Sequence, residues 1–210
     1  MALTIYLIID PMCSWCWGFR SVWHEFQSEL PATVRVVDLM GGLAPDTDQP
    51  MDAATRDYVQ GAWRAVAART GAKFNFAFWD ECSPRRTTYP ACRAVVAAGL
   101  QTLSARKAMY EAVQSAYFLL AKNPSEESTL IMLAGELGLD VQRFAQDLNS
   151  RAVDQQLGSE LHKVREFGVT GFPSLIWHRH PPDAPARSGL LATGYTDLDR
   201  LRARWAELLA

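Results

Sequence analysis

The chain has 210 residues, of which 49% are hydrophobic and 21% charged, and its formal net charge is −2. This balance suits a folded domain with a sizeable core, and it excludes the basic footprint of a nucleic-acid-binding protein or a polybasic membrane patch. No apolar stretch approaches the length of a membrane span, and the N-terminal apolar run lacks the preceding basic residue of a secretory signal. We therefore expect a cytoplasmic protein without nucleic-acid or membrane partners.

The first predicted elements form a β-α-β unit. Residues 3–9 make a near-continuous apolar run rich in β-branched side chains, which is typical of a strand covered on both faces. Residues 14–30 carry apolar side chains at helical spacing, Pro31 ends that pattern, and residues 33–40 predict a second strand. Two strands joined by a helix in this way are expected to be parallel, with a right-handed connection.

Cys13 and Cys16 stand three residues apart at the junction of the first strand and the helix. The first turn of a helix leaves backbone N–H groups unpaired, and these favour a negative charge such as a thiolate. We therefore predict that Cys13 is the activated sulfur and that Cys16, one turn further along the same face, can close a disulfide with it. Taken alone, the pair also fits half of a zinc site or a chance pair of buried cysteines.

The middle of the chain, from about residue 50 to residue 167, is predicted to be wholly helical. Apolar spacing predicts one helix around Trp63, a second that runs from Cys92 to Leu103, and a third that ends before Asn123. Further helical patterns continue to Gly168, and Asp140 is placed to cap one of them.

Strands return only near residues 174–177 and 190–192, and a last helix follows that we expect Thr196 to cap. The order of elements predicts an α/β fold that is split by a helical insertion. We assign residues 1–45 and 168–210 to the α/β domain and residues 46–167 to the insertion.

A second informative stretch is Gly-Val-Thr-Gly-Phe-Pro-Ser at residues 168–174, where Pro173 directly precedes a predicted strand. Proline lacks an N–H group and tolerates a cis peptide bond far better than other residues. A cis Phe172–Pro173 bond is therefore compatible with this stretch, and an ordinary trans proline at the start of an edge strand is the alternative.

The motif around Cys13 (Asp-Pro-Met-Cys-Ser-Trp-Cys-Trp-Gly-Phe), the helical insertion and the Gly-Val-Thr-Gly-Phe-Pro-Ser-Leu motif together resemble the DsbA family of thioredoxin-fold proteins. Within that family the chain is most similar to the cytoplasmic, leaderless branch of FrnE-like or predicted disulfide isomerases. A weaker match is Thr-Thr-Tyr-Pro-Ala-Cys-Arg at residues 87–93, similar to the Asn-Thr-x-x-Ala-His-Arg stretch of many relatives. Thr87 and Cys92 replace the Asn and the His of that stretch.

The resemblance implies a thioredoxin-like fold and the activity of a thiol-disulfide oxidoreductase or protein disulfide isomerase, without a cofactor or a metal. It also implies that Cys13 is the attacking thiolate and Cys16 the resolving thiol. Partners would be proteins that carry thiols or disulfides, with glutathione as a further candidate. By the same resemblance, the substrate-binding residues are Ser14, Trp15, Phe172 and Pro173.

Other chemically active side chains receive plainer interpretations. His24 lies on the helix of Cys13, but about 16 Å along the axis, which is too far for it to act as the base of Cys13. His178 and His180 share one face of a strand without a nearby third ligand, so we expect a solvated edge rather than a metal site. We expect Cys92 to be buried and inert, whereas Cys82 could be an auxiliary reactive thiol.

Two rival functions come from other classes of protein. The first is a glutathione-dependent isomerase or transferase of the kappa type. Proteins of that type have an architecture that resembles the one expected here, but they use a serine where this chain has Cys13. The second is a non-catalytic peptide-binding or chaperone module that holds unfolded chains on the aromatic surface near Trp15 and Trp17. The intact pair of cysteines argues against both.

Overall fold

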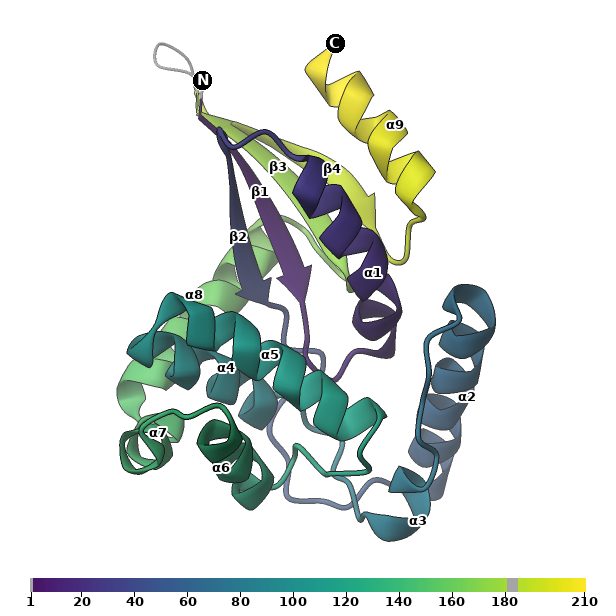
Figure 1. Ribbon diagram of the computed structural model, residues 1–210, viewed down its shortest axis with the longest axis vertical. Coiled ribbons are helices and arrows are strands. Elements are labelled where there is room, and N and C mark those ends of the chain that lie inside the picture. The colour runs from purple at the N-terminus through teal and green to yellow at the C-terminus, as the bar shows by residue number, and fades with distance from the viewer. Residues whose placement is uncertain (1, 181–184) are drawn as a thin grey trace.

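The computed structural model describes residues 2–180 and 185–210. A four-stranded sheet with the order β2-β1-β3-β4 forms one part, and most helices gather beside its end (Figure 1). β1 and β2 are parallel, as the sequence predicted, whereas β3 is antiparallel to both β1 and β4. The strands are β1 (Ala2–Ile9), β2 (Val34–Met40), β3 (Ser174–His180) and β4 (Arg187–Thr193).

Both faces of β1 are covered, which explains its continuous apolar sequence. Ile5, Leu7 and Ile9 belong to the main core, together with side chains of α1 (Ser14–Glu29) and α9 (Leu198–Leu209). Ile8 points to the other face and packs with Val164 of α8 (Arg151–Glu166). Because side chains alternate along a strand, this one segment holds two layers of helices on the sheet.

The segment between β2 and α8 is helical, as predicted, but one helix boundary differs from the prediction. Leu103 does not continue the helix of Cys92; Thr102 caps a new helix there, and Leu103 is 86% exposed. Ser150 caps α8. The helices of this segment are α2 (Ala53–Thr70), α3 (Phe78–Glu81), α4 (Tyr89–Gln101), α5 (Leu103–Phe118), α6 (Glu127–Glu136) and α7 (Val141–Leu148).

The caps of the later helices follow ordinary side-chain chemistry. Asp140 caps α7, as predicted, because its carboxylate accepts the N–H of Arg143. The prediction that Thr196 caps the last helix is wrong: Asp197 is the cap and accepts the N–H of Arg200, while Thr196 is buried. Asp and Thr are both favoured at this position, so the spacing alone did not separate the two neighbours.

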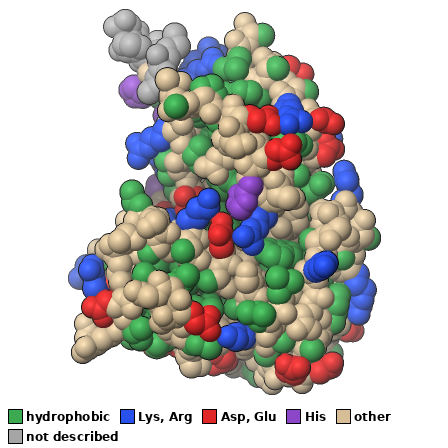
Figure 2. Space-filling view, viewed as in Figure 1, with side chains coloured by type: hydrophobic (Ala, Val, Ile, Leu, Met, Phe, Trp, Pro, Cys, Tyr) green, Lys and Arg blue, Asp and Glu red, His purple; other side chains and the backbone are tan. Residues whose placement is uncertain are grey.

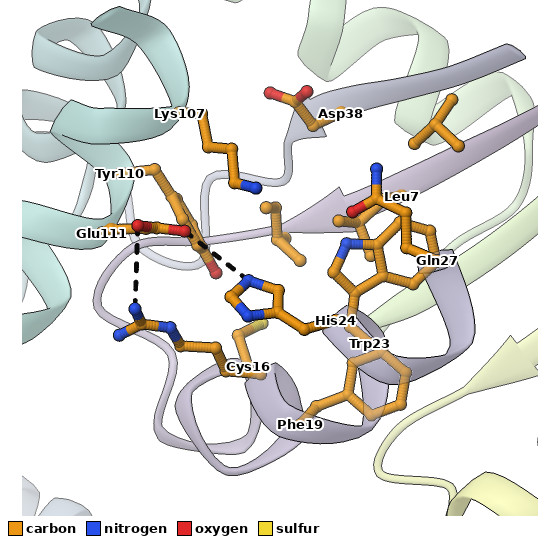
Figure 3. Close-up of a pocket in the computed structure, with 13 residues that line it drawn as sticks. Leu7, Cys16, Phe19, Trp23, His24, Gln27, Asp38, Lys107, Tyr110 and Glu111 are labelled. Atoms are coloured by element: carbon orange, nitrogen blue, oxygen red, sulfur yellow. Dashed lines mark ion pairs between the residues drawn. The ribbon is translucent and has the colours of Figure 1, made fainter. Parts of the chain in front are cut away.

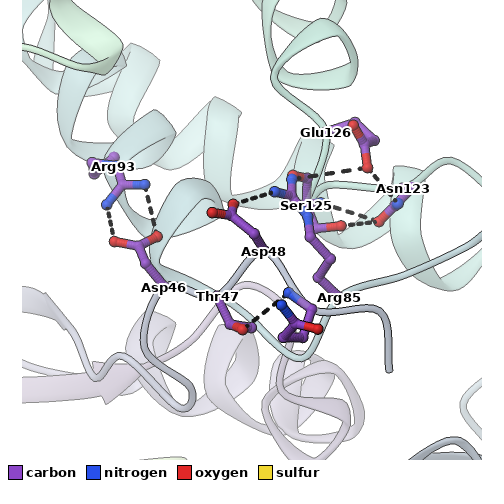
Figure 4. Close-up of polar contacts among 9 residues, drawn as sticks. Asp46, Thr47, Asp48, Arg85, Arg93, Asn123, Ser125 and Glu126 are labelled. Carbon is purple, nitrogen blue, oxygen red and sulfur yellow. Dashed lines mark hydrogen bonds and ion pairs between the residues drawn. The ribbon is translucent and has the colours of Figure 1, made fainter. Parts of the chain in front are cut away.

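Polar contacts fasten the loop between β2 and α2 to the helices (Figure 4). Arg93 of α4 makes a bidentate ion pair with Asp46, at 2.7 and 2.9 Å. Arg85 pairs with Asp48 at 3.5 Å and also donates to the carbonyl oxygen of Ser125. The loop is therefore tied to the helical segment at two points.

α8 joins the sheet to the helical segment. Its buried Glu160 accepts the N–H of Met40, the last residue of β2, and Arg106 of α5, each at 2.8 Å. Since Arg106 also bonds Asp38 at 2.8 Å, one cation connects α5, α8 and β2. The division of the chain at residues 45 and 168 remains a proposal, with α8 in contact with both parts.

Candidate active site

Cys13 occupies the N-cap position of α1, at the strand-to-helix junction that the sequence predicted. Its N–H donates to the carbonyl oxygen of Asp10 at 3.1 Å, which closes the turn after β1. Its Sγ accepts the backbone N–H of Cys16 at 3.4 Å. The sulfur thus takes the place of the oxygen that usually caps a helix, where the positive end of the helix dipole favours negative charge.

The second sequence motif lies directly beside this sulfur. The Sγ of Cys13 donates to the carbonyl oxygen of Phe172 at 3.7 Å, across 159 positions of the chain. The Phe172–Pro173 peptide bond is cis, which is one of the two conformations that the sequence analysis left open. Gly41 makes room for Phe172, because a Cβ at position 41 would lie 2.3 Å from the ring. The end of β2 therefore helps to hold this segment against Cys13.

Cys16 lies one turn into α1 and is 3% exposed, and both cysteines of the pair are free thiols. Burial raises the pKa of the Cys16 thiol well above its ordinary value, and the neighbouring Cys13 raises it further. Cys16 is therefore protonated at neutral pH in this dithiol form. The arrangement gives one sulfur that accepts a hydrogen bond at the helix start and one that stays a thiol behind it.

A groove of about 310 Å³ adjoins the Cys13 side of α1. The rings of Trp15 and Tyr195 lie 6.2 Å apart along it, and the guanidinium of Arg69 lies 4.9 Å above the ring of Tyr195. Of the predicted substrate-binding residues, Trp15 and Phe172 line the groove, whereas Ser14 and Pro173 lie outside its lining. Arg69 and Tyr195, which the sequence analysis missed, complete it together with Gly194.

Asp10 is the centre of a buried polar cluster that the sequence analysis also missed. Its carboxylate accepts the N–H of Met12 at 2.8 Å, the N–H of Leu43 at 2.7 Å and the hydroxyl of Thr88 at 2.6 Å. The thiol of Cys92 donates to the same carboxylate at 3.6 Å. This one side chain ties the turn before Cys13 to the loop after β2 and to α4.

The carboxyl group of Asp10 is fully buried, and this burial raises its pKa despite the hydrogen bonds from Leu43, Thr88 and Met12, which act in the opposite direction. The signal in the sequence was an aspartate placed directly after a buried strand and three residues before Cys13. Apart from Met12, its partners could not be found from spacing, because they come from residues 33 to 82 positions away.

Three further residues that the sequence analysis considered are Cys92, Thr87 and Cys82. Cys92 is fully buried, as predicted, and burial and Asp10 raise its pKa well above the ordinary value. Thr87 is buried with its hydroxyl unpartnered among the described residues, so Thr88 is the threonine that bonds Asp10. Cys82 is partly exposed and donates to Ala121 at 3.2 Å, and partial burial raises its pKa, which disfavours an auxiliary thiolate.

Within residues 2–180 and 185–210, no cluster of three His, Cys, Asp or Glu residues has the arrangement to hold a metal ion. The rings of His178 and His180 lie 6.4 Å apart on β3. None of the helices in the described part of the chain is both long enough and apolar enough to span a membrane.

Fold and site together define a thioredoxin-fold protein with a pair of thiols at the start of its first helix. The sequence profile of the thioredoxin family matches residues 6–202. The chain therefore belongs to the thioredoxin family. The predicted fold class, a thioredoxin-like α/β fold of the DsbA type with added helices, is confirmed.

Among solved structures, the chain is similar to a proposed protein disulfide isomerase from Nitrosomonas europaea, with 29% identity and a TM-score of 0.85. That match covers 100% of this chain and 98% of the other. The cytosolic disulfide reductase DsbM from Pseudomonas aeruginosa has the same fold, with a TM-score of 0.73 and 98% coverage of both chains at 24% identity.

Curated relatives carry a different description. The ClpXP adapter protein SpxH from Halalkalibacterium halodurans is 27% identical over 197 residues, which is 92% of this chain and 63% of the relative. SpxH from Bacillus subtilis is 26% identical over 178 residues, which is 83% of this chain and 58% of the relative. The chain thus spans about three fifths of the length of these relatives.

Proposed function

We propose that the protein is a thiol-disulfide oxidoreductase, of the disulfide isomerase type, in which Cys13 is the nucleophile and Cys16 the resolving thiol. The observation that carries the proposal is the position of the Cys13 sulfur. It lies between the N–H of Cys16 and the carbonyl oxygen of Phe172, at the positive end of α1. Thiolates are the reactive form of cysteine, and a backbone N–H at the start of a helix is a donor that can stabilise the charge that develops on a sulfur.

The reaction runs in two exchanges. The Cys13 thiolate attacks one sulfur of a substrate disulfide, forms a mixed disulfide and releases the other substrate sulfur as a thiolate. Cys16 then gives its proton to the released substrate thiolate and attacks the Cys13 sulfur, so the second substrate sulfur leaves as a thiolate and a Cys13–Cys16 disulfide remains. Two electrons pass from the pair to the substrate, and the reverse sequence oxidises a substrate dithiol.

The groove beside Cys13 supports a peptide as the substrate. Trp15, Phe172 and Tyr195 offer flat apolar surfaces, and the carbonyl oxygen of Phe172 lies 3.7 Å from the Cys13 sulfur. We include Ser14 in the proposed contact set because it begins α1 beside Cys13. Protein thiols and disulfides are the proposed partners, with glutathione as a small one, and the cytoplasm is the proposed compartment.

Reduction of insulin disulfides tests the proposal. Cys13→Ser should remove the activity, because no other described cysteine combines a helix N-terminus with a neighbouring thiol. Cys82→Ser is the matched control, since Cys82 is partly exposed and outside the site, and it should retain most of the activity. Full insulin reduction by Cys13→Ser would refute the assignment.

A second candidate function is that of an adapter, because the curated relatives described above are ClpXP adapter proteins. An adapter acts by binding partners, so it does not require electron transfer through the two thiols. Binding of purified ClpX to the wild-type chain and to the Cys13→Ser/Cys16→Ser double variant distinguishes the two functions. Equal binding by both proteins supports an adapter; an absence of binding leaves the oxidoreductase as the single candidate.

A further inference from the structure

A cavity of about 90 Å³ lies between α1 and α5, and Cys16 is part of its wall (Figure 3). Cys13 is not among the residues that line it, and the cavity shares no lining residue with the groove beside Cys13. The cavity has room for about three water molecules, by the volume that each takes in the liquid. Cys16 therefore borders a space of its own while a substrate occupies the groove.

The resolving step needs a path for one proton. Cys16 is a thiol that is 3% exposed, and it must become a thiolate before it can attack the disulfide on Cys13. The released substrate thiolate, which finally takes up a proton, lies on the side of the groove, and Cys16 does not line that groove. The cavity is the space through which the proton can leave the Cys16 sulfur.

The inner wall of this cavity is apolar, whereas its mouth is polar. The inner wall includes Leu7, Phe19 and Trp23. At the mouth, Figure 3 shows Glu111 of α5 reaching toward His24 of α1. Basic, acidic and histidine side chains accordingly gather in the middle of the face in Figure 2, where Figure 1 places α1 and α5. Water at the mouth therefore has polar partners.

Tyr110 of α5 brings a polar group to the inner part of the cavity. Figure 3 shows its ring extending from α5 toward Cys16. Its hydroxyl oxygen accepts the Nε2–H of Gln114 at 2.9 Å, and within residues 2–180 and 185–210 its own proton meets no acceptor. Burial raises the pKa of Tyr110 well above its ordinary value, so the hydroxyl stays a donor. It can therefore hold a water molecule near the sulfur.

His24 lies eight residues beyond Cys16 on α1, which is about 12 Å along the helix axis. Side chains of a helix point back toward its N-terminus, and Figure 3 shows the imidazole of His24 turned toward Cys16. The spacing leaves a gap between the ring and the sulfur that water in the cavity can bridge.

The carboxylates around His24 are already paired with cations. Glu111 lies 3.6 Å from the Nε2 of His24 and 3.7 Å from Arg20. Asp38 of β2, the other carboxylate of the lining, is bonded by Arg106 at 2.8 Å. Glu111 is therefore placed to stabilise the imidazolium that forms when His24 takes up a proton.

The protonation state of His24 suits a proton acceptor. Burial lowers the pKa of His24, and the nearby Lys107 and Arg20 also lower it, whereas Glu111 acts in the opposite direction. His24 is therefore largely neutral at pH 7, and the neutral imidazole is the form that accepts a proton.

We propose that this cavity is the exit path of the Cys16 proton in the resolving step, and that His24 accepts this proton through water in the cavity. The Cys16 sulfur then uses the freed electron pair to bond the Cys13 sulfur. The bond between Cys13 and the substrate breaks, and the substrate sulfur leaves with its electron pair. The imidazolium gives its proton to solvent, from which the released substrate thiolate takes one up. This inference rests on the proposed function, because it needs Cys16 as the resolving thiol.

The reaction of the reduced protein with dithiobis(nitrobenzoate) isolates the resolving step. Cys13 attacks this disulfide and releases one coloured nitrothiobenzoate, at a rate that rises with the concentration of the reagent. Cys16 then displaces the second nitrothiobenzoate within the molecule, at a rate that is independent of that concentration. All variants carry Cys82→Ser, because Cys82 is partly exposed, whereas Cys92 is fully buried. Stopped-flow absorbance records both releases.

His24→Gln should slow the second release at pH 7 at least about tenfold and leave the first release unchanged. The side chain of His24 is 42% exposed, so the substitution should leave the fold intact. The neutral imidazole is the acceptor, so the second release of the wild type should slow as the pH falls through the pKa of His24, below its ordinary value of 6.5. His24→Gln should lack this step in the pH profile.

His162→Gln is the matched control. His162 pairs with Glu166 at 3.5 Å on the exposed side of α8, outside the cavity, and its loss should change neither release. An unchanged second release in His24→Gln would overturn the inference, and so would a slower release that keeps the wild-type pH profile, because that result would show a structural role. A wild-type chain that releases only one nitrothiobenzoate would instead refute the proposed function, since Cys16 would then not resolve the intermediate.

Discussion

Two buried clusters of this protein, one around Trp63 and one around Asp10, are stabilised by different forces. Trp63 of α2 is completely buried, and its indole N–H has no partner among the described residues. Six rings surround it with centroids 5.1 to 5.8 Å away: Phe74, Phe76, Phe78, Trp79, Tyr117 and Phe118. Asp10 is equally buried but accepts hydrogen bonds from three chain segments.

Aromatic packing and hydrogen bonding affect different properties of the protein. Aromatic packing is stabilising in many orientations, so the Trp63 cluster contributes mainly to the stability of the helical segment. Hydrogen bonds to a carboxylate are directional and costly to leave unmade, so the Asp10 cluster fixes the geometry of the turn that ends at Cys13. We therefore expect mutations in the first cluster to change stability and mutations in the second to change the reactivity of the thiols as well.

The largest loss of stability is expected for Trp63→Ala, at about 4 kcal/mol, because the cavity left among six rings cannot collapse fully. Urea unfolding measures this loss. Tyr58→Ala on the same helix is the control, since Tyr58 is 71% exposed and should change stability by less than about 0.5 kcal/mol. The folded fraction of Trp63→Ala should reduce insulin at the wild-type rate; a slower rate would mean that the two clusters are not independent.

Asp10→Ala should cost less, about 3 kcal/mol, because it leaves the buried donors of Met12, Leu43 and Thr88 without an acceptor. It should nevertheless lower the rate of insulin reduction by the folded protein at least about tenfold, because the turn before Cys13 is no longer fixed. Rate and stability are measured on the same preparation. Wild-type activity in the folded fraction would show that Asp10 does not control the reactivity of Cys13.

The pH dependence of the unfolding free energy of Asp10→Asn gives a second test of the Asp10 cluster. Burial raises the pKa of Asp10 above its ordinary value of 3.8, so the folded state holds this proton more tightly than the unfolded chain. The stabilisation that the protonated Asp10 carboxyl contributes is fully present below pH 3.8. It is lost as the pH rises through the pKa that Asp10 has in the folded state. The advantage of the wild type over Asp10→Asn in unfolding free energy should therefore shrink as the pH rises. A constant or growing advantage would contradict the raised pKa.

The smallest effect in this series is expected for Cys92→Ala, at about 1 kcal/mol, because the Sγ of Cys92 is a weak donor to Asp10 and fills little volume. Thermal unfolding measures the change. Cys92→Ser, which keeps a donor in this place, should recover part of the loss. An effect as large as that of Asp10→Ala would make Cys92 a main support of the cluster.

The same contrast explains how much the sequence could predict. The helix around Trp63 was predicted, because apolar side chains recur along it at helical spacing. The strands, the parallel β1–β2 pair and the position of Cys13 at the start of α1 also followed from local patterns. Each of these depends on residues close together in the sequence.

What could not be predicted depends on contacts between distant segments. Asp10 meets Leu43 and Thr88 only once β2 and α4 are in place, and no spacing rule connects these positions. The same holds for Arg69 and Tyr195, which come from α2 and from the segment after β4 and meet at the groove. His24 was judged only by its distance from Cys13 along the helix, and the structure shows that it lines a cavity together with Cys16.

Trapping of a mixed disulfide tests the central claim, that Cys13 attacks and Cys16 resolves, most directly. With Cys16→Ser the intermediate on Cys13 cannot be displaced from within the molecule, so adducts with a disulfide-containing protein should accumulate and disappear on reduction. Cys13→Ser should form none, and Cys82→Ser should behave like the wild type. Adducts that persist in Cys13→Ser and vanish in Cys82→Ser would contradict the assignment and move the nucleophile to Cys82.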